Sequence, residues 1–141
     1  MAQSELVVRR FALLDWSIQG VFSGRPTAVA ASTPPADGGT AKFGSIFYCP
    51  VDLCVGDFRL LRGTSGSSGT TTVEVWRLRA SVWTLLTTLS VASGTSFTMS
   101  SASMGGQDPL SIFQPGDVII SRLVALEAGS PADLVLRVEL R

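Results

Sequence analysis

The sequence contains no histidine, a single lysine (Lys42) and only two cysteines, and 16% of its 141 residues are charged. Without an imidazole, His-based catalytic triads and histidine metal sites are excluded. Eleven basic residues balance eleven acidic ones, so the chain lacks the excess of positive charge that nucleic-acid binders need. Hydrophobic residues make up 45% and the mean hydropathy is +0.36, the opposite of a disordered chain. The composition predicts one apolar, neutral globular domain.

Signals for export and for membrane insertion are missing as well. The first ten residues place an acid before the apolar residues, which Arg9 and Arg10 then interrupt, so we expect no signal peptide. The longest apolar runs, such as residues 118–120, have the length of a strand rather than the roughly 20 residues of a membrane helix. Cys49 and Cys54 have no further cysteine or histidine to complete a zinc site, so we expect two buried thiols, with a disulfide between them left open.

Strands, not helices, are the predicted elements. No 12-residue window keeps apolar residues at helical spacing, and the best helix candidate, residues 4–14, fits an extended arm equally well. Serine and threonine total 30 and glycine 14, which favours strands joined by turns. Alternating apolar residues predict strands at 16–22, 43–48, 54–61, 71–78, 82–89, 95–99, 118–126 and 134–140. This spacing indicates an all-β antiparallel sandwich or barrel.

The segments between these strands carry turn signals. Residues 63–69 contain three glycines, residues 79–81 are typical of a hairpin, and residues 114–117 read Gln-Pro-Gly-Asp, a tight turn. Residues 28–40 predict a long irregular loop. The short turn at 127–133 predicts that the last two strands pair with each other as a hairpin.

One strand breaks its own alternation. Trp76 and Leu78 have the opposite parity to Val73 and Val75. We therefore expect a β-bulge in this strand or an apolar patch that faces solvent.

Candidate catalytic groups are few and weak. The glycine-rich turn at 63–69 lacks the Gly-Lys-Ser/Thr ending of a phosphate-binding loop. Asp52 and Asp57 flank the start of a strand and could share a cation, but solvated turn acids are the favoured interpretation. No pair of carboxylates stands out as a hydrolytic pair. We expect no enzymatic activity, no cofactor and no metal.

Four arginines lie in or beside two of the predicted strands, 54–61 and 71–78. If those strands are neighbours, the arginines form a modest basic stripe that can dock on an acidic surface through bidentate carboxylate pairs. The alternative is that they pair with Glu74 and other local acids. The candidate interaction residues are Arg9, Arg10, Arg59, Arg62, Arg77, Arg79 and Trp76.

Three segments together are distinctive. They are the turn and strand GTSGSSGTTTV at 63–73, the turn FQPGDV at 113–118, and the last strand ADLVLRVEL at 132–140. They are similar to a jelly-roll module of tailed-bacteriophage virions, found in capsid decoration (cement) proteins and tail-fibre tips. The resemblance covers about residues 43–141. One departure is the stretch 77–81, Arg-Leu-Arg-Ala-Ser, where similar modules often carry a Lys-Asn-Gly hairpin.

The resemblance implies a jelly-roll β-sandwich of about eight strands over residues 41–141. Residues 1–40 then supply an extended N-terminal arm, the first strand and a loop. Outward apolar residues such as Trp76, Leu78 and Val135 would be buried by trimerisation, at about 25 cal/mol per Å² of apolar surface.

The function that the resemblance implies is structural: a homotrimeric capsid decoration protein on the outer surface of the virion, assembled in the host cytoplasm. Its partners would be itself and the major capsid protein of the shell, with no nucleic acid and no membrane. The alternative is a tail-fibre or head-fibre tip module that binds a host surface receptor. A cupin-like sandwich is disfavoured because cupin metal sites rely on histidine.

Overall fold

The computed structural model describes residues 12–21, 34–35, 46–104 and 109–140, and within them almost every element is a β-strand. The strands are β1 (Ala12–Val21), β2 (Phe47–Tyr48), β3 (Leu53–Thr64), β4 (Thr70–Arg79), β5 (Val82–Ala92), β6 (Thr98–Ser103), β7 (Ile112–Phe113), β8 (Val118–Ala125) and β9 (Ala132–Leu140). A single 3-10 turn, η1 (Pro109–Ser111), precedes β7. No helix among the described residues is long and apolar enough to cross a membrane.

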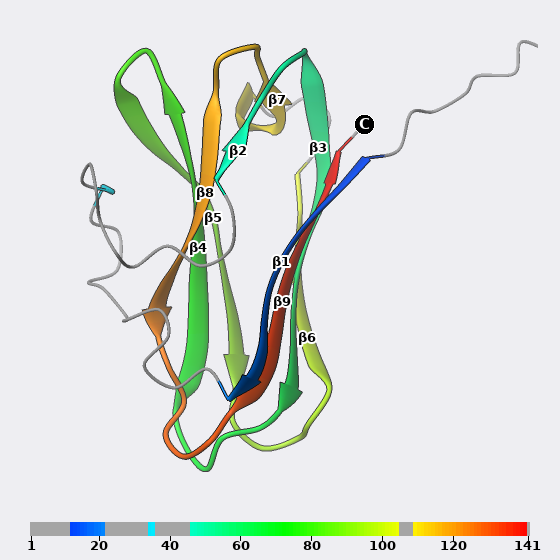
Figure 1. Cartoon of the computed structure of the whole chain (residues 1–141), viewed down its shortest axis with the longest axis vertical. Coiled ribbons are helices and arrows are strands. Elements are labelled where there is room, and N and C mark those ends of the chain that lie inside the picture. Colours follow the sequence, from blue (N-terminus) through cyan, green and yellow to red (C-terminus); the bar gives the residue numbers. More distant parts are fainter. Residues whose placement is uncertain (1–11, 22–33, 36–45, 105–108, 141) are drawn as a thin grey trace, which may run out of the picture.

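The strands form two antiparallel sheets that face each other (Figure 1). Sheet A has the order β1-β9-β3-β6, with β7 paired to the start of β3, and sheet B has the order β2-β8-β4-β5. The predicted all-β sandwich is therefore confirmed. Strand β1 pairs with β9 from Ala12 to Val21, so this part of the N-terminal segment belongs to the sandwich. The rest of residues 1–40, except Pro34 and Pro35, lies outside the described residues.

The predicted hairpin between the last two strands is wrong. Strand β8 pairs with β2 and β4 in sheet B, whereas β9 pairs with β1 and β3 in sheet A. Residues 126–131 carry the chain from one sheet to the other across the end of the sandwich (Figure 1). A short turn has the same sequence signals whether it joins two paired strands of one sheet or carries the chain to the other sheet. By crossing, β9 pairs with two strands, β1 and β3. Sequence spacing alone does not separate these outcomes.

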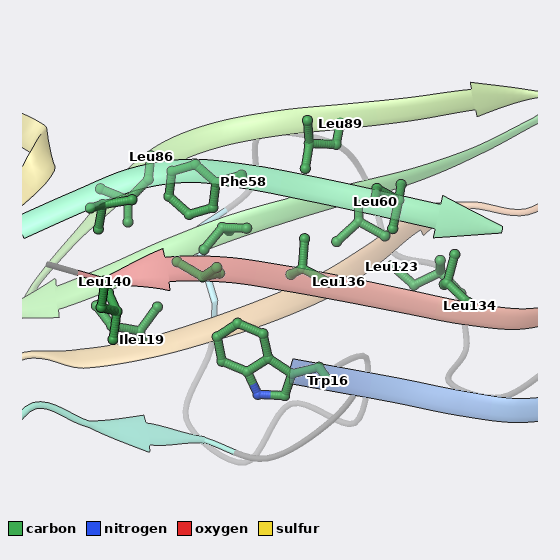
Figure 2. Close-up of a cluster of buried hydrophobic side chains, with 14 of the residues drawn as sticks. Trp16, Phe58, Leu60, Leu86, Leu89, Ile119, Leu123, Leu134, Leu136 and Leu140 are labelled. Carbon is green, nitrogen blue, oxygen red and sulfur yellow. The ribbon is translucent and has the colours of Figure 1, made fainter. Parts of the chain in front are cut away.

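The hydrophobic core fills the space between the two sheets (Figure 2). Strand β9 alternates as predicted, because Leu134, Leu136, Val138 and Leu140 are all buried. Facing residues of sheet B include Ile119 and Leu123 on β8 and Leu86 and Leu89 on β5, while Trp16 of β1 and Phe58 and Leu60 of β3 complete the interior. Each fully buried side chain of this size contributes about 1.5–3 kcal/mol of transfer free energy.

The bulge expected in β4 is not in that strand, because the extra residue lies on its partner β5. The register between β4 and β5 shifts between Val75 and Trp76, and Leu86 is the extra residue, turned toward the core. Trp76 therefore lies on the outer face of sheet B, as its parity predicted. It is nevertheless only 4% exposed, so it is not a solvent-facing side chain.

The turns agree with their sequence signals at two places. The β4–β5 hairpin turns at Ala80 and Ser81, whose φ angles of 48° and 63° match the two-residue turn with positive φ at both central positions. In the turn before β8, Gly116 has a φ of 92°, which a side chain would strain. Both predicted turns are confirmed.

Candidate interaction surfaces

The four arginines from two predicted strands do not form one stripe. Arg59 and Arg62 lie on β3 in sheet A, whereas Arg77 and Arg79 lie on β4 in sheet B. The condition for a shared basic surface, that the two strands are neighbours, is not met. Three of the four instead form an ion pair with a nearby acid.

Arg62 is completely buried at the end of the sandwich where the β3–β4, β5–β6 and β8–β9 turns meet. Its Nη1 donates to the carbonyl of Ala92 at 2.9 Å and to the carboxylate of Glu127, and its Nη2 donates to the carbonyl of Thr95 at 2.5 Å. The Glu127 carboxylate also accepts from the hydroxyl of Thr71 at 3.0 Å. This arginine joins three turns and faces no solvent, so it is a structural residue and not a docking group. We call this region the Arg62 end.

Glycines allow the turns of the Arg62 end to approach closely. A Cβ on Gly66 would lie 2.4 Å from the carbonyl oxygen of Ala128, and one on Gly63 would lie 2.8 Å from the Cβ of Asp133. Of the three glycines of this turn, Gly69 alone has a positive φ. The turn therefore needs two of its glycines for space rather than for conformation.

An exposed apolar surface lies on the outer face of sheet A. Leu61 of β3 is opposite Met99 of β6 on one side and Val135 of β9 on the other. Leu61 and Met99 are exposed, Met99 by 56%. Together with Arg59 and Arg137 these residues line a shallow hollow of about 270 Å³, which we call the sheet A hollow. Its floor is apolar and crosses three neighbouring strands.

The arginines beside the sheet A hollow are held by acids. Arg137 donates from Nε and Nη2 to the two carboxylate oxygens of Asp15, at 2.8 and 2.9 Å. These hydrogen bonds from Arg137, with its charge, lower the pKa of Asp15 despite the desolvation of the carboxyl. Arg59 contacts Asp57 at 3.3 Å. The hollow is therefore bordered by balanced charge.

Phe97 projects from the β5–β6 turn close to this face. Its backbone N–H donates to the carbonyl of Gly63 at 2.6 Å, two residues along β3 from Leu61. The φ of Phe97 is 57°, a left-handed conformation that costs an L-residue about 1–2 kcal/mol. Its side chain is 80% exposed. Arg62 helps to fix this turn through Thr95, so the Arg62 end positions an aromatic side chain in solvent.

The opposite end of the sandwich holds a second charged group. Arg79 donates from Nε and Nη2 to the two carboxylate oxygens of Asp117, at 2.8 and 2.6 Å. The backbone N–H of Gln114 donates to the same carboxylate at 2.8 Å. Burial raises the pKa of Asp117, but these hydrogen bonds and the arginine charge outweigh it and hold the pKa below its ordinary value. The hydrogen bond to Asp117 raises the pKa of Arg79 in turn.

Arg77 lies beside this pair and is 7% exposed. Its Nη1 donates to the carbonyl of Ile112 at 3.3 Å, and Arg79 donates to the same oxygen at 3.0 Å. Its buried Nε has no hydrogen-bond partner in the part of the chain that the structure describes. Burial, and then the charge of Arg79, lower the pKa of Arg77. We call this region the Arg77 end.

Trp76 belongs to a buried cluster on the outer face of sheet B. Its indole N–H donates to the carboxylate of Glu74 at 2.9 Å, and Arg122 donates to the same oxygen at 3.1 Å. The Arg122 guanidinium lies 5.2 Å from the centre of the indole ring, within the range of a cation–π contact. Trp76 is therefore engaged inside the protein and does not offer a free aromatic face to a partner.

The remaining candidate residues are placed as follows. Arg9 and Arg10 lie outside the described residues. Asp57 is within β3, bonded to Arg59 and Ser103, rather than in a turn. Among the residues placed in the structure, no group of three or more His, Cys, Asp or Glu side chains is arranged to hold a metal ion. Cys49 is buried and Cys54 partly buried, and both are free thiols.

Sequence reasoning missed Glu127 and Asp117 as arginine partners. Both sit at the end of a predicted strand or in a turn, where an acid is ordinary, and no local pattern reveals that they face the interior. Comparison with known proteins adds no assignment, because no family model and no curated protein matches the chain.

Proposed function

We propose that this protein is a structural virion protein, a homotrimeric capsid decoration (cement) protein that binds the outer surface of a phage shell. The observation that carries the proposal is the apolar surface of exposed Leu61 and Met99 and partly buried Val135, with exposed Phe97 in the β5–β6 turn that bonds to β3. Exposed apolar surface bordered by polar groups is typical of protein–protein contacts, where Met, Phe and Arg are enriched.

The strand order supports the jelly-roll topology that goes with this role. Each sheet combines strands from the first and the last part of the chain, in the orders β1-β9-β3-β6 and β2-β8-β4-β5. A double-sheet jelly roll contains two Greek keys, in which late strands return beside early ones. Leu61 and Met99 are exposed on the outer face of sheet A at the sheet A hollow.

The charges around the sheet A hollow suit a contact with protein. Arg59 and Arg137 are each paired with an acid, so the surface has no excess positive charge with which to attract nucleic acid. In a trimer, a heterologous contact places the hollow of one subunit against a different surface of the next, and the ring closes after three. A protein that binds only the assembled shell stabilises it by RT ln(1 + [L]/Kd) per site.

The test is to image whole particles and to quantify this chain against the major capsid protein. We expect a copy number comparable to that of the shell protein, with density clustered in threes on the outer surface. A few copies confined to the tail or to one vertex would overturn the proposal in favour of the fibre-tip alternative.

Variants test the surface itself. Leu61→Lys combined with Met99→Lys should convert the trimer to monomer in analytical ultracentrifugation and abolish decoration of particles. Ser90→Lys, an exposed change on β5 in sheet B, is the matched control and should leave both unchanged. Retained trimers in the double variant would exclude the sheet A hollow as the subunit contact.

A further inference from the structure

We propose that Arg77 and Arg79 form a receiving site for an acidic side chain of a protein partner, at the Arg77 end of the sandwich. The inference depends on the proposed structural role only in that the ligand comes from a protein. It requires neither a trimer nor a particular place on a virion.

The first ground is the balance of charge. Two guanidinium groups and one carboxylate lie together, and the carboxylate of Asp117 already accepts three N–H groups, two from Arg79 and one from Gln114. The charge of Asp117 acts on Arg77 as well, but among the described residues no carboxylate forms a hydrogen bond or ion pair with Arg77. A buried guanidinium with no carboxylate partner is unfavourable in the free protein, because burial penalises a charge that is not paired. An incoming carboxylate removes that penalty.

The second ground is the geometry of the donors. Arg77 and Arg79 are two residues apart on β4, so their side chains share one face of the strand. Both donate to the carbonyl oxygen of Ile112, which brings their terminal nitrogens to the same point. A pair of planar guanidinium groups with spare N–H donors matches the two oxygens of a carboxylate. Arg79 is one-third exposed, so the pair opens to solvent on that side.

The third ground is the apolar rim. Ile112, whose carbonyl joins the two arginines, is exposed, and so is Val82, which lies opposite Arg79 in the β4–β5 hairpin. Tyr48 is exposed too, and its hydroxyl lies near Gly116, next to Asp117. Arginine and tyrosine among exposed apolar side chains are typical of the centre of a protein interface.

The charge of the site also favours a protein carboxylate over a nucleic-acid phosphate as its ligand. Nucleic-acid sites gather several basic residues in excess of acids, whereas the described residues of this site are two arginines and one aspartate, in a chain of zero net charge. The occupant we infer is an aspartate or glutamate flanked by apolar residues.

Side-chain NMR of the isolated full chain tests the site. The protein is labelled with ¹⁵N-arginine, and the Nε–Hε signals are followed while N-acetyl-aspartic acid amide is added. We expect saturable shifts of the Arg77 and Arg79 signals with a Kd on the order of 1–10 mM, typical of a single charged contact. N-acetyl-asparagine amide, the neutral match, should produce no saturable shift. A second titration, with inorganic phosphate, measures whether the site prefers a phosphate group.

Two variants of Arg77 and one control variant test the assignment. Arg77→Met should weaken the binding of N-acetyl-aspartic acid amide at least tenfold and raise the urea midpoint, because a buried unpaired charge is removed. Arg59→Met, an exposed arginine of the sheet A hollow, is the control and should change neither. Arg77→Lys keeps the charge but loses the planar fork, so it should bind more weakly than the wild type.

The possible results of these titrations distinguish the absence of a site from a site with a different ligand. Absence of saturable shifts in the wild type, or unchanged binding in Arg77→Met, would overturn the site. Binding of phosphate tenfold tighter than the aspartate probe would overturn the acidic-protein ligand in favour of a phosphate-bearing one. None of these results depends on copy number or oligomeric state, so failure here is distinguishable from failure of the proposed function.

Discussion

The two ends of the sandwich each bury an arginine, but they neutralise it differently. At the Arg62 end, the guanidinium meets the buried carboxylate of Glu127 and two backbone carbonyls. At the Arg77 end, the nearby carboxylate of Asp117 is hydrogen-bonded to Arg79, and the partner that the described residues give Arg77 is the carbonyl of Ile112. The Nε of both arginines lacks a hydrogen-bond partner among the described residues, so the difference between the two ends is the carboxylate that Arg62 has. A buried charge paired with a carboxylate stabilises the fold, and our proposal assigns to Arg77 the capacity to bind one.

The difference follows from where each arginine sits. Arg62 lies where three turns converge, and the β8–β9 turn that crosses between the sheets places Glu127 against it. Arg77 lies near the opposite end, beside β7, where the neighbouring group is the carbonyl of Ile112. The crossing of the chain thus places a carboxylate against the arginine at one end of the sandwich.

The largest expected effect is at the Arg62 end. Arg62→Met leaves the Glu127 carboxylate buried without its cation, so the free energy of unfolding should fall by about 3–5 kcal/mol. Urea denaturation of the full chain measures it. Replacing both partners, Arg62→Met with Glu127→Met, should recover most of the loss, because no charge remains buried. A loss below about 1 kcal/mol in the single variant would break the comparison, since the two ends would then differ little.

A smaller effect is expected from Asp117 at the Arg77 end. Asp117→Asn removes the charge from its hydrogen bonds with Arg79, which should lower the free energy of unfolding by about 2 kcal/mol. Two buried or half-buried arginines then face each other without an acid. The same variant should shift the Arg77 and Arg79 side-chain NMR signals. Unchanged stability would show that the Arg77 end does not depend on its one carboxylate.

The lowered pKa of Asp117 predicts how the stability of the folded protein changes with pH. The pKa of Asp117 is lower in the folded protein than its ordinary value of 3.8, so the unfolded chain takes up the proton first as pH falls. The stability that Asp117 supplies is therefore complete well above pH 3.8 and is lost as pH falls through the folded pKa. Urea midpoints measured from about pH 6 downward should fall less steeply for Asp117→Asn than for the wild type. Parallel profiles would contradict this assignment.

The smallest effect is expected at the sheet A hollow. Asp15 and Arg137 pair with good geometry, yet their side chains are 44% and 49% exposed. Exposed ion pairs contribute little because water screens them. Asp15→Asn should leave the urea midpoint within experimental error of the wild type. If Asp15→Asn lowers the free energy of unfolding as much as Asp117→Asn does, then the exposure of an ion pair does not determine how much it stabilises this protein.

The sequence predicted local structure well wherever a pattern lies within one element. The alternation of residues 134–140 identified the buried face of β9, whereas the bulge expected at Trp76 in β4 lies at Leu86 in β5. The grouping of the candidate interaction residues was predicted less well. Arg77 and Arg79 were named, but grouped with Arg59 and Arg62, because sequence distance does not say that β3 and β4 belong to different sheets.

What the sequence by itself determined is therefore the class of structure: an apolar, neutral, all-β chain with strands and tight turns at defined places, since side-chain alternation and turn residues act within a few positions. The tertiary structure decided which strands pair, that β8 and β9 part into different sheets, and which acid meets which arginine. Glu127 and Arg62 are 65 residues apart, and Asp117 and Arg79 are 38 apart. Such partners are selected by the packing of the two sheets around one core, which no local pattern encodes.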